Sequence, residues 1–151
     1  MILPMPLHKI NLTIDPRYAG QVDRARLRAA ARAALKHQQA PMPGALTIVV
    51  ADDATLHQLN CEFLGEDRPT DVLSFPSGEA DSEAGGRYFG DIALSLPTAR
   101  AQARTAGHPL GAELQLLVVH GVLHLLGHDH ANKEEQARMW QAQAEILETL
   151  G

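Results

Sequence analysis

The sequence predicts an α+β fold: a single domain with a roughly four-stranded mixed sheet, about five helices packed against it, and the histidine-bearing helix at the centre. Three observations support this prediction. The chain has 151 residues, which suits one hydrophobic core. Segments with the period of strands alternate with segments of helical composition, in the order β-α-β-α-β-β-α-α-α. No sequence repeat or linker interrupts this order, so we expect residues 1–151 to form one domain.

The first part of the chain predicts two strands separated by a helix. Apolar and polar side chains alternate over residues 8–14, as in a half-buried strand. A turn with Pro16 and Gly20 follows, and residues 21–38, rich in Ala, Leu and Arg, favour a helix. The apolar run over residues 45–51 then predicts a buried strand.

A second helix is predicted over residues 53–64. Asp52 or Asp53 can cap its N-terminus, and Gly65 can end it. The helical position of Cys61 among apolar neighbours predicts a core residue rather than a nucleophile. Cys61 is also the only cysteine in the sequence, which excludes a disulfide within the chain.

The second half of the chain predicts two strands and three helices. These elements are strands over residues 71–75 and 88–95, a helix that Pro97 begins and Gly107 and Pro109 interrupt, an apolar helix over 110–126 and an amphipathic helix over 133–149. The segment 77–87 between the two strands contains glycines and acidic residues without a period, so we predict a loop there.

Composition limits the classes of function. The formal net charge of −5 argues against a generally basic coat for nucleic acid, so any nucleic-acid partner would have to bind a local basic patch. Residues 1–6 lack a basic start and a long apolar run, which predicts no secretory signal. No segment approaches the ~20 apolar residues of a membrane span. We therefore expect a cytoplasmic protein that does not contact a membrane.

Three histidines form the strongest chemical motif. His120 and His124 are four residues apart and lie about 40° apart on one helix face. His130 would point elsewhere on a continuous helix, but Gly127 can adopt a positive φ, end the helix and turn the chain back. The three imidazoles can then bind one ion and leave a position for water, as in catalytic zinc sites. We predict one Zn²⁺, although other imidazole-binding divalent metals suit the same ligands.

The residues between the three histidines limit the kinds of reaction that a metal site here could catalyse. The spacing matches the metzincin signature H-E-x-x-H-x-x-G-x-x-H, but Gly121 replaces the Glu that serves those proteases as general base. Asp129 has three open roles: it can orient a ligand imidazole, act on the water, or bond its own backbone as a turn residue. His128 is expected to be an exposed side chain.

Candidate contacts for phosphate lie outside the histidine segment. Cations recur every four residues on the first predicted helix and form a basic stripe of Arg24, Arg28, Arg32 and Lys36. This stripe is either a solvated helix face or a contact surface for a nucleic-acid backbone. Arg87 and the hydroxyl of Ser74 are further candidates, with hydrogen bonding at a strand end as the alternative for Ser74.

Three stretches of the chain resemble the bacterial YbeY endoribonucleases, which are rRNA maturation factors. They are residues 69–76 (PTDVLSFP), 90–92 (GDI) and 120–130 (HGVLHLLGHDH), and the resemblance is clearest from the helix near residue 53 onward. It implies zinc-dependent, single-strand-specific endoribonuclease activity on ribosomal RNA precursors, notably at the 3′ end of the small-subunit RNA. It also implies a role in ribosome quality control, with small-subunit ribosomal proteins as partners. The role of metal ligand carries over to His120, His124 and His130.

The chain departs from this family at two positions. Many members have Tyr at the position of His128, from which we expect little consequence. Many also have Arg four residues after the Asn that corresponds to Asn60, where this chain has Leu64. An Arg gives a bidentate phosphate contact and a Leu cannot. Arg68 lies nearby as a possible substitute, so Asp129 and Arg68 are the predicted catalytic residues.

Two other functions stay open at this point. The first is a non-catalytic ribosome assembly factor with a structural metal, which Leu64 favours. The second is a different metallohydrolase such as a peptidase, which the Gly at position 121 disfavours.

Overall fold

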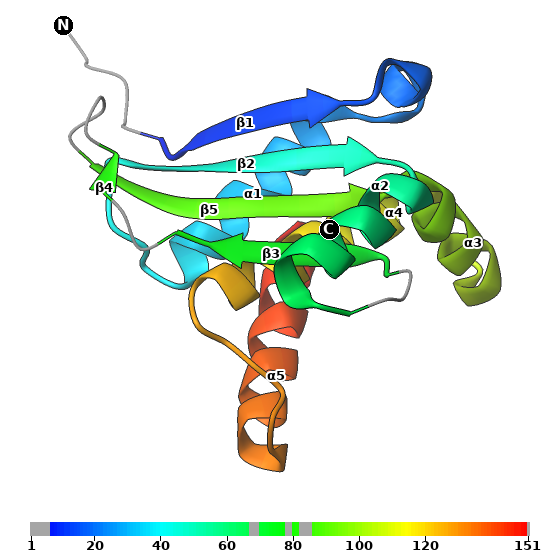
Figure 1. Cartoon of the computed structure of the whole chain (residues 1–151). Coiled ribbons are helices and arrows are strands. Elements are labelled where there is room, and N and C mark those ends of the chain that lie inside the picture. The colour runs from blue at the N-terminus through cyan, green and yellow to red at the C-terminus, as the bar shows by residue number, and fades with distance from the viewer. Residues whose placement is uncertain (1–6, 67–69, 78–79, 82–85, 151) are drawn as a thin grey trace, which may run out of the picture.

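A mixed β-sheet organises the fold. The computed structural model describes residues 7–66, 70–77, 80–81 and 86–150 (Figure 1). The strands are β1 (Lys9–Ile14), β2 (Gly44–Ala51), β3 (Val72–Pro76), β5 (Gly86–Ser95) and the two-residue β4 (Ala80–Asp81). Their order is β1-β2-β5-β3, with the first three strands parallel and β3 antiparallel to β5. The predicted α+β class and four-stranded mixed sheet are confirmed.

The helices agree closely with the sequence-based expectations. They are α1 (Arg24–His37), α2 (Asp53–Leu59), α3 (Leu96–Ala106), α4 (Leu110–Leu125) and α5 (Lys133–Thr149), together with the 3₁₀-helix η1 (Pro16–Gln21) and the π-helical turn η2 (Asn60–Leu64). Asp52 caps α2 by accepting the backbone N–H of Thr55, and Asn132 caps α5 in the same way. None of the helices within the described residues has the length and apolar character to cross a membrane.

Two short elements differ from the predictions. The segment predicted as a turn after β1 forms η1, and the segment predicted as a loop before β5 contains β4, which pairs with the start of β5. Both elements are too short to show a hydrophobic period in the sequence. In the long helix predicted over residues 53–64, the last turn widens into η2 before Gly65 ends it with a φ of +67°.

The main core lies between the sheet and the helices α1 and α4. Figure 1 shows both helices behind the sheet, while α2 covers one end of the front face. α4 is buried nearly all round: Leu114, Val118, Val119, Val122 and Leu123 are at most 1% exposed. A smaller apolar cluster under α2 joins Leu56 to Ala93 and Leu73 on the other face of the sheet. α4 is therefore the central helix, as predicted, and its position is fixed from several sides.

Arginines of α1 bond the free edge of β1. The Nε atom of Arg28 donates to the Ile10 carbonyl at 3.2 Å, and that of Arg32 donates to the His8 carbonyl at 3.0 Å. Charged side chains along an edge strand satisfy carbonyls that lack a neighbouring strand and protect the edge from pairing with another chain. Two cations of the basic stripe thus have a structural role.

Gly90 permits the close approach of β3 to β5. The register between β2 and β5 shifts at Ala45 and Leu46, and Gly90 has a φ of +135°. A Cβ at this position would lie 2.2 Å from the Phe75 carbonyl oxygen. Only glycine meets both conditions without strain.

We expect Gly90→Ala to lower the free energy of unfolding by about 3 kcal/mol or more, because it combines backbone strain with a clash against main chain. Urea denaturation of the metal-free protein measures this change. Gly20→Ala is the control, since no atom lies within 4 Å of its added Cβ. We expect the control to change stability by less than about 0.5 kcal/mol, and similar stabilities for the two variants would contradict the assignment.

Candidate metal centre

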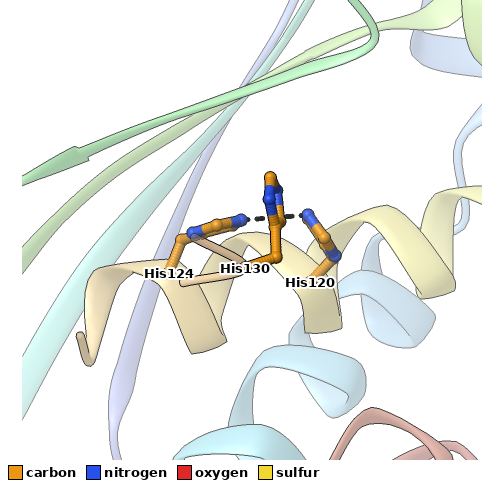
Figure 2. A group of neighbouring side chains, drawn as sticks. All are labelled: His120, His124 and His130. Atoms are coloured by element: carbon orange, nitrogen blue, oxygen red, sulfur yellow. Dashed lines mark hydrogen bonds between the residues drawn. The ribbon is translucent and has the colours of Figure 1, made fainter. Parts of the chain in front are cut away.

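The three predicted histidines converge in space. His120 and His124 lie one turn apart on α4, and His130 lies in the segment that follows it. Figure 2 shows the three rings turned toward one another. Their potential ligand nitrogens all lie within 4.8 Å of one another, and the Nε2 atoms of His120 and His124 are 3.1 Å apart. The structure therefore brings together the ligand set that the sequence predicts.

A glycine-dependent turn returns the chain to α4. Gly127 has a φ of +98°, and its N–H donates to the His124 carbonyl at 3.1 Å. The next N–H, that of His128, donates to the Leu123 carbonyl at 3.0 Å. These two bonds form a Schellman motif, which ends a helix and reverses the chain direction. The prediction that Gly127 ends the helix and allows His130 to return is confirmed.

Hydrogen bonding and burial prepare the imidazoles for a metal. Nδ1 of His120 lies 3.1 Å from Oε1 of Gln143, an acceptor on α5. This contact places the ring proton on Nδ1 and leaves the Nε2 lone pair for a ligand. Burial lowers the pKa of His120 below its ordinary value. Burial, then the neighbouring His120 and His130, lower the pKa of His124 in the same direction. The neutral forms, which bind metals, are thus favoured at neutral pH.

The triad opens onto a cleft of about 360 Å³. Besides the three histidines, the cleft is lined by Leu64, Thr70, Asp71, Val72, Leu73, Ser74 and Pro76. β3 forms one wall, and the hydroxyl of Ser74 donates to the Gly121 carbonyl on α4 at 3.1 Å. The predicted alternative for Ser74, a structural hydrogen bond from the strand, is present, and its side chain also faces the cleft.

A divalent ion fits this donor set. Imidazole nitrogens coordinate zinc at about 2.0–2.1 Å, so ligand nitrogens around one ion lie roughly 3 Å apart. The separation of 3.1 Å between His120 and His124 meets this requirement, and His130 is exposed and close enough to complete the set. Three protein ligands would leave room for one more ligand on such an ion, as a hydrolytic site requires.

The packing of α4 explains why position 121 holds glycine. Gly121 is buried, and a Cβ there would lie 2.9 Å from Cγ2 of Ile92 on β5. The site that the metzincin signature assigns to a catalytic Glu is therefore occupied by the contact between α4 and the sheet. A Glu at this position would have no space and no solvent, which argues against a peptidase of that class.

The other residues between the ligands have defined contacts. The Asp129 carboxylate accepts the backbone N–H of His130 at 2.7 Å and is otherwise exposed. His128 was expected to be exposed, but it is half-buried and its Nε2 lies 2.7 Å from Oε1 of Gln38 at the end of α1. Cys61 was expected in the core and is exposed, because it lies on the outer side of η2. The sequence pattern of this short helix did not reveal which of its sides faces the sheet.

Among the described residues, the cations predicted to contact phosphate do not gather at the triad. Arg28 and Arg32 bond β1, at the opposite edge of the sheet from β3. Arg24 is exposed at the N-terminus of the same helix, and Lys36 is exposed near its C-terminus. Arg87 is exposed and lines a separate hollow that includes Gly127. Arg68 lies outside the described residues.

Two residues of α5 that the sequence did not single out contact the triad. Gln143 bonds His120, and the ring centroid of Trp140, one turn earlier, lies 5.8 Å from that of His120. In the sequence α5 has the pattern of an ordinary amphipathic helix. The spacing of Trp140 and Gln143 becomes informative only once α5 is known to lie beside α4.

Comparison with known proteins agrees with this site. A family model described as Endoribonuclease YbeY matches residues 14–151. The protein of that name from Roseiflexus sp. (strain RS-1) is 41% identical, over 94% of this chain and 92% of its own. The one from Pelotomaculum thermopropionicum is 42% identical, over 97% of each chain. The solution structure of TM1509 from Thermotoga maritima is similar with a TM-score of 0.61 and 25% identity, covering 93% of this chain and 88% of that one.

We expect Gln143→Leu to weaken zinc binding roughly 10- to 100-fold, because His120 loses the acceptor that fixes its ring and tautomer. Competition with a chromophoric chelator measures the affinity. Gln136→Leu changes an exposed glutamine on the same helix and should bind zinc like the unmodified protein. Equal affinities for both variants would show that Gln143 does not support the metal ligand.

Proposed function

Because the chain belongs to the Endoribonuclease YbeY family, we propose that it is a zinc-dependent endoribonuclease that cleaves single-stranded ribosomal RNA precursors. The proposed substrate is the 3′ region of the small-subunit RNA. The proposal includes a role in ribosome quality control, with small-subunit ribosomal proteins as partners and the cytoplasm as location. The observation that carries it is the convergence of three histidines on an open cleft.

The described residues suit hydrolysis of a phosphodiester. When bound, a divalent metal supplies Lewis acidity, which polarises a phosphoryl oxygen and acidifies water. The chain contributes three imidazoles as ligands and Gln143 to orient one of them. Asp129, adjacent to His130, is the proposed proton acceptor. Arg68 is the proposed phosphate contact in place of the Arg expected at position 64, where Leu64 lines the cleft.

The proposed path of the RNA backbone uses cations that flank the turn after α4. Arg87 lines a hollow together with Leu126 and Gly127, next to the turn. Lys36 lies near the end of α1, where Gln38 bonds His128. Arg24, Arg28 and Arg32 continue the stripe away from the triad, and Ser74 is the proposed hydroxyl contact within the cleft. Such contacts hold a polyanion without base specificity.

The unmodified protein should cleave single-stranded ribosomal RNA fragments, and a chelator should abolish this activity, which added zinc restores. His124→Ala should lose both the metal and the cleavage, since two ligands cannot hold the ion in a hydrolytic geometry. Asp129→Asn should keep the metal and lower kcat by roughly 10²- to 10⁴-fold, as expected for a general base. Gel analysis of end-labelled RNA and metal quantification check these outcomes. Cleavage that persists in chelator would contradict metal dependence.

Removal of the Arg87 charge should weaken RNA binding several-fold. The slope of log affinity against log salt should also decrease in magnitude by about 0.7, because the variant neutralises one phosphate fewer on the single strand. Arg87→Gln is compared with Arg100→Gln, which removes the same charge from α3, away from the triad. Identical affinities and salt slopes for these two variants would exclude Arg87 from the RNA path.

A non-catalytic ribosome assembly factor is the second candidate, because the cleft has Leu64 where the family resemblance leads us to expect Arg. On this alternative the metal is structural. A folded, metal-free His124→Ala protein that still supports maturation of the small-subunit RNA in cells would favour it over catalysis.

A further inference from the structure

An exposed tryptophan borders the metal centre. Trp140 lies on the outer side of α5 and is 42% exposed. Its ring centroid is 5.8 Å from that of His120 and 6.3 Å from that of His130. The described residues include five large apolar side chains with high exposure: Leu7, Met42, Phe63, Leu64 and Trp140. Two of these five, Leu64 and Trp140, border the triad, so apolar surface is concentrated where substrate would bind.

The cleft offers little positive charge to a polyanion. Among the described residues that line it, Asp71 carries a formal charge, and the others are neutral polar, apolar or histidine side chains. Leu64, Val72 and Pro76 give much of the lining an apolar character. The described lining therefore supplies no Lys or Arg to hold a phosphate. Contacts to the bases are the alternative source of affinity.

We propose that Trp140 is a stacking platform for an unpaired nucleobase, next to the nucleotide whose phosphate is held at the triad. The ring centroid of Trp140 lies 5.8 Å from that of His120, so a base adjacent to that phosphate is within its reach. An aromatic ring accepts any base, because every base has a π-face. A paired base is already stacked within its helix. The platform rests on the proposed function and gives it a physical basis for single-strand preference.

A different role for Trp140 makes different predictions. If the ring only shields the histidines from water, a large aliphatic side chain should serve as well as an aromatic one. Substitutions would then alter zinc affinity rather than RNA affinity. If the ring stacks on bases, Phe should replace it better than Leu, and zinc affinity should change little. The set Trp140→Phe and Trp140→Leu therefore separates the two roles.

The chain contains one tryptophan, so its fluorescence reports on this position alone. The zinc-loaded protein is titrated with a short single-stranded RNA oligonucleotide, with the same RNA annealed to its complement, and with an abasic ribose-phosphate oligomer. Readings are taken before cleavage is detectable on a gel. We expect the single strand to quench the fluorescence with saturation, and the duplex and the abasic oligomer to quench it weakly.

Affinities measured with end-labelled RNA then compare the variants. We expect Trp140→Leu to weaken single-strand binding roughly 5- to 100-fold, Trp140→Phe to weaken it less, and both to bind zinc normally. Thr105→Ala, a change to an exposed side chain on α3, should bind RNA like the unmodified protein. Circular dichroism confirms that each variant is folded.

Three binding results would overturn the proposal. They are equal quenching by the abasic oligomer, equal RNA affinity of Trp140→Leu and Trp140→Phe, or a loss of zinc in Trp140→Leu that accounts for its loss of RNA binding. If the unmodified zinc-loaded protein neither binds nor cleaves single-stranded RNA, the proposed function itself fails, and the platform fails with it. Cleavage with an unchanged KM in Trp140→Leu rejects the platform alone.

Discussion

Gly127 adopts a φ of +98°, and the candidate metal centre depends on this one backbone conformation. Because the chain reverses there, His130 returns to the side of α4 that carries His120 and His124. The turn satisfies the last carbonyls of α4 through the N–H groups of Gly127 and His128. The same two bonds therefore end the helix and bring the third ligand to the other two. A side chain at this φ would be strained, so glycine is the residue that permits both.

The rest of the fold fixes the position of α4 and of the turn that follows it. Gly121 lets the helix pack closely on Ile92 of β5, and its carbonyl accepts the hydroxyl of Ser74 on β3. On the other side, α5 supplies Gln143 to His120, while Gln38 at the end of α1 bonds His128 within the turn. Ligands held by packed elements need little reorganisation when they bind an ion. The contact between α4 and the sheet also occupies the position at which a metalloprotease has its Glu, so this one packing contact separates the two chemistries.

The charge distribution bears on how an acidic protein would hold RNA. Its net charge is −5, and two arginines of the basic stripe bond carbonyls of β1. The described cleft residues add no Lys or Arg, Leu64 gives the cleft apolar surface, and the exposed ring of Trp140 lies beside His120 and His130. A metal ion in the triad would add positive charge at the scissile position. Recognition through bases and a few peripheral cations is consistent with this arrangement.

The sequence by itself determined the helices, the main strands and the three candidate metal ligands, because these features follow from short-range rules: hydrophobic period, capping residues, and the spacing of two histidines before a glycine. Tertiary structure alone decided that Gln143 and Trp140 contact His120. It also decided that Arg28 and Arg32 bond the carbonyls of Ile10 and His8. Finally, it decided that His128 is half-buried and that Cys61 is exposed. Each of these depends on which face of one element meets another that is distant along the chain. A local pattern shows that a helix has two faces, but only the packing of the whole domain decides what each face touches.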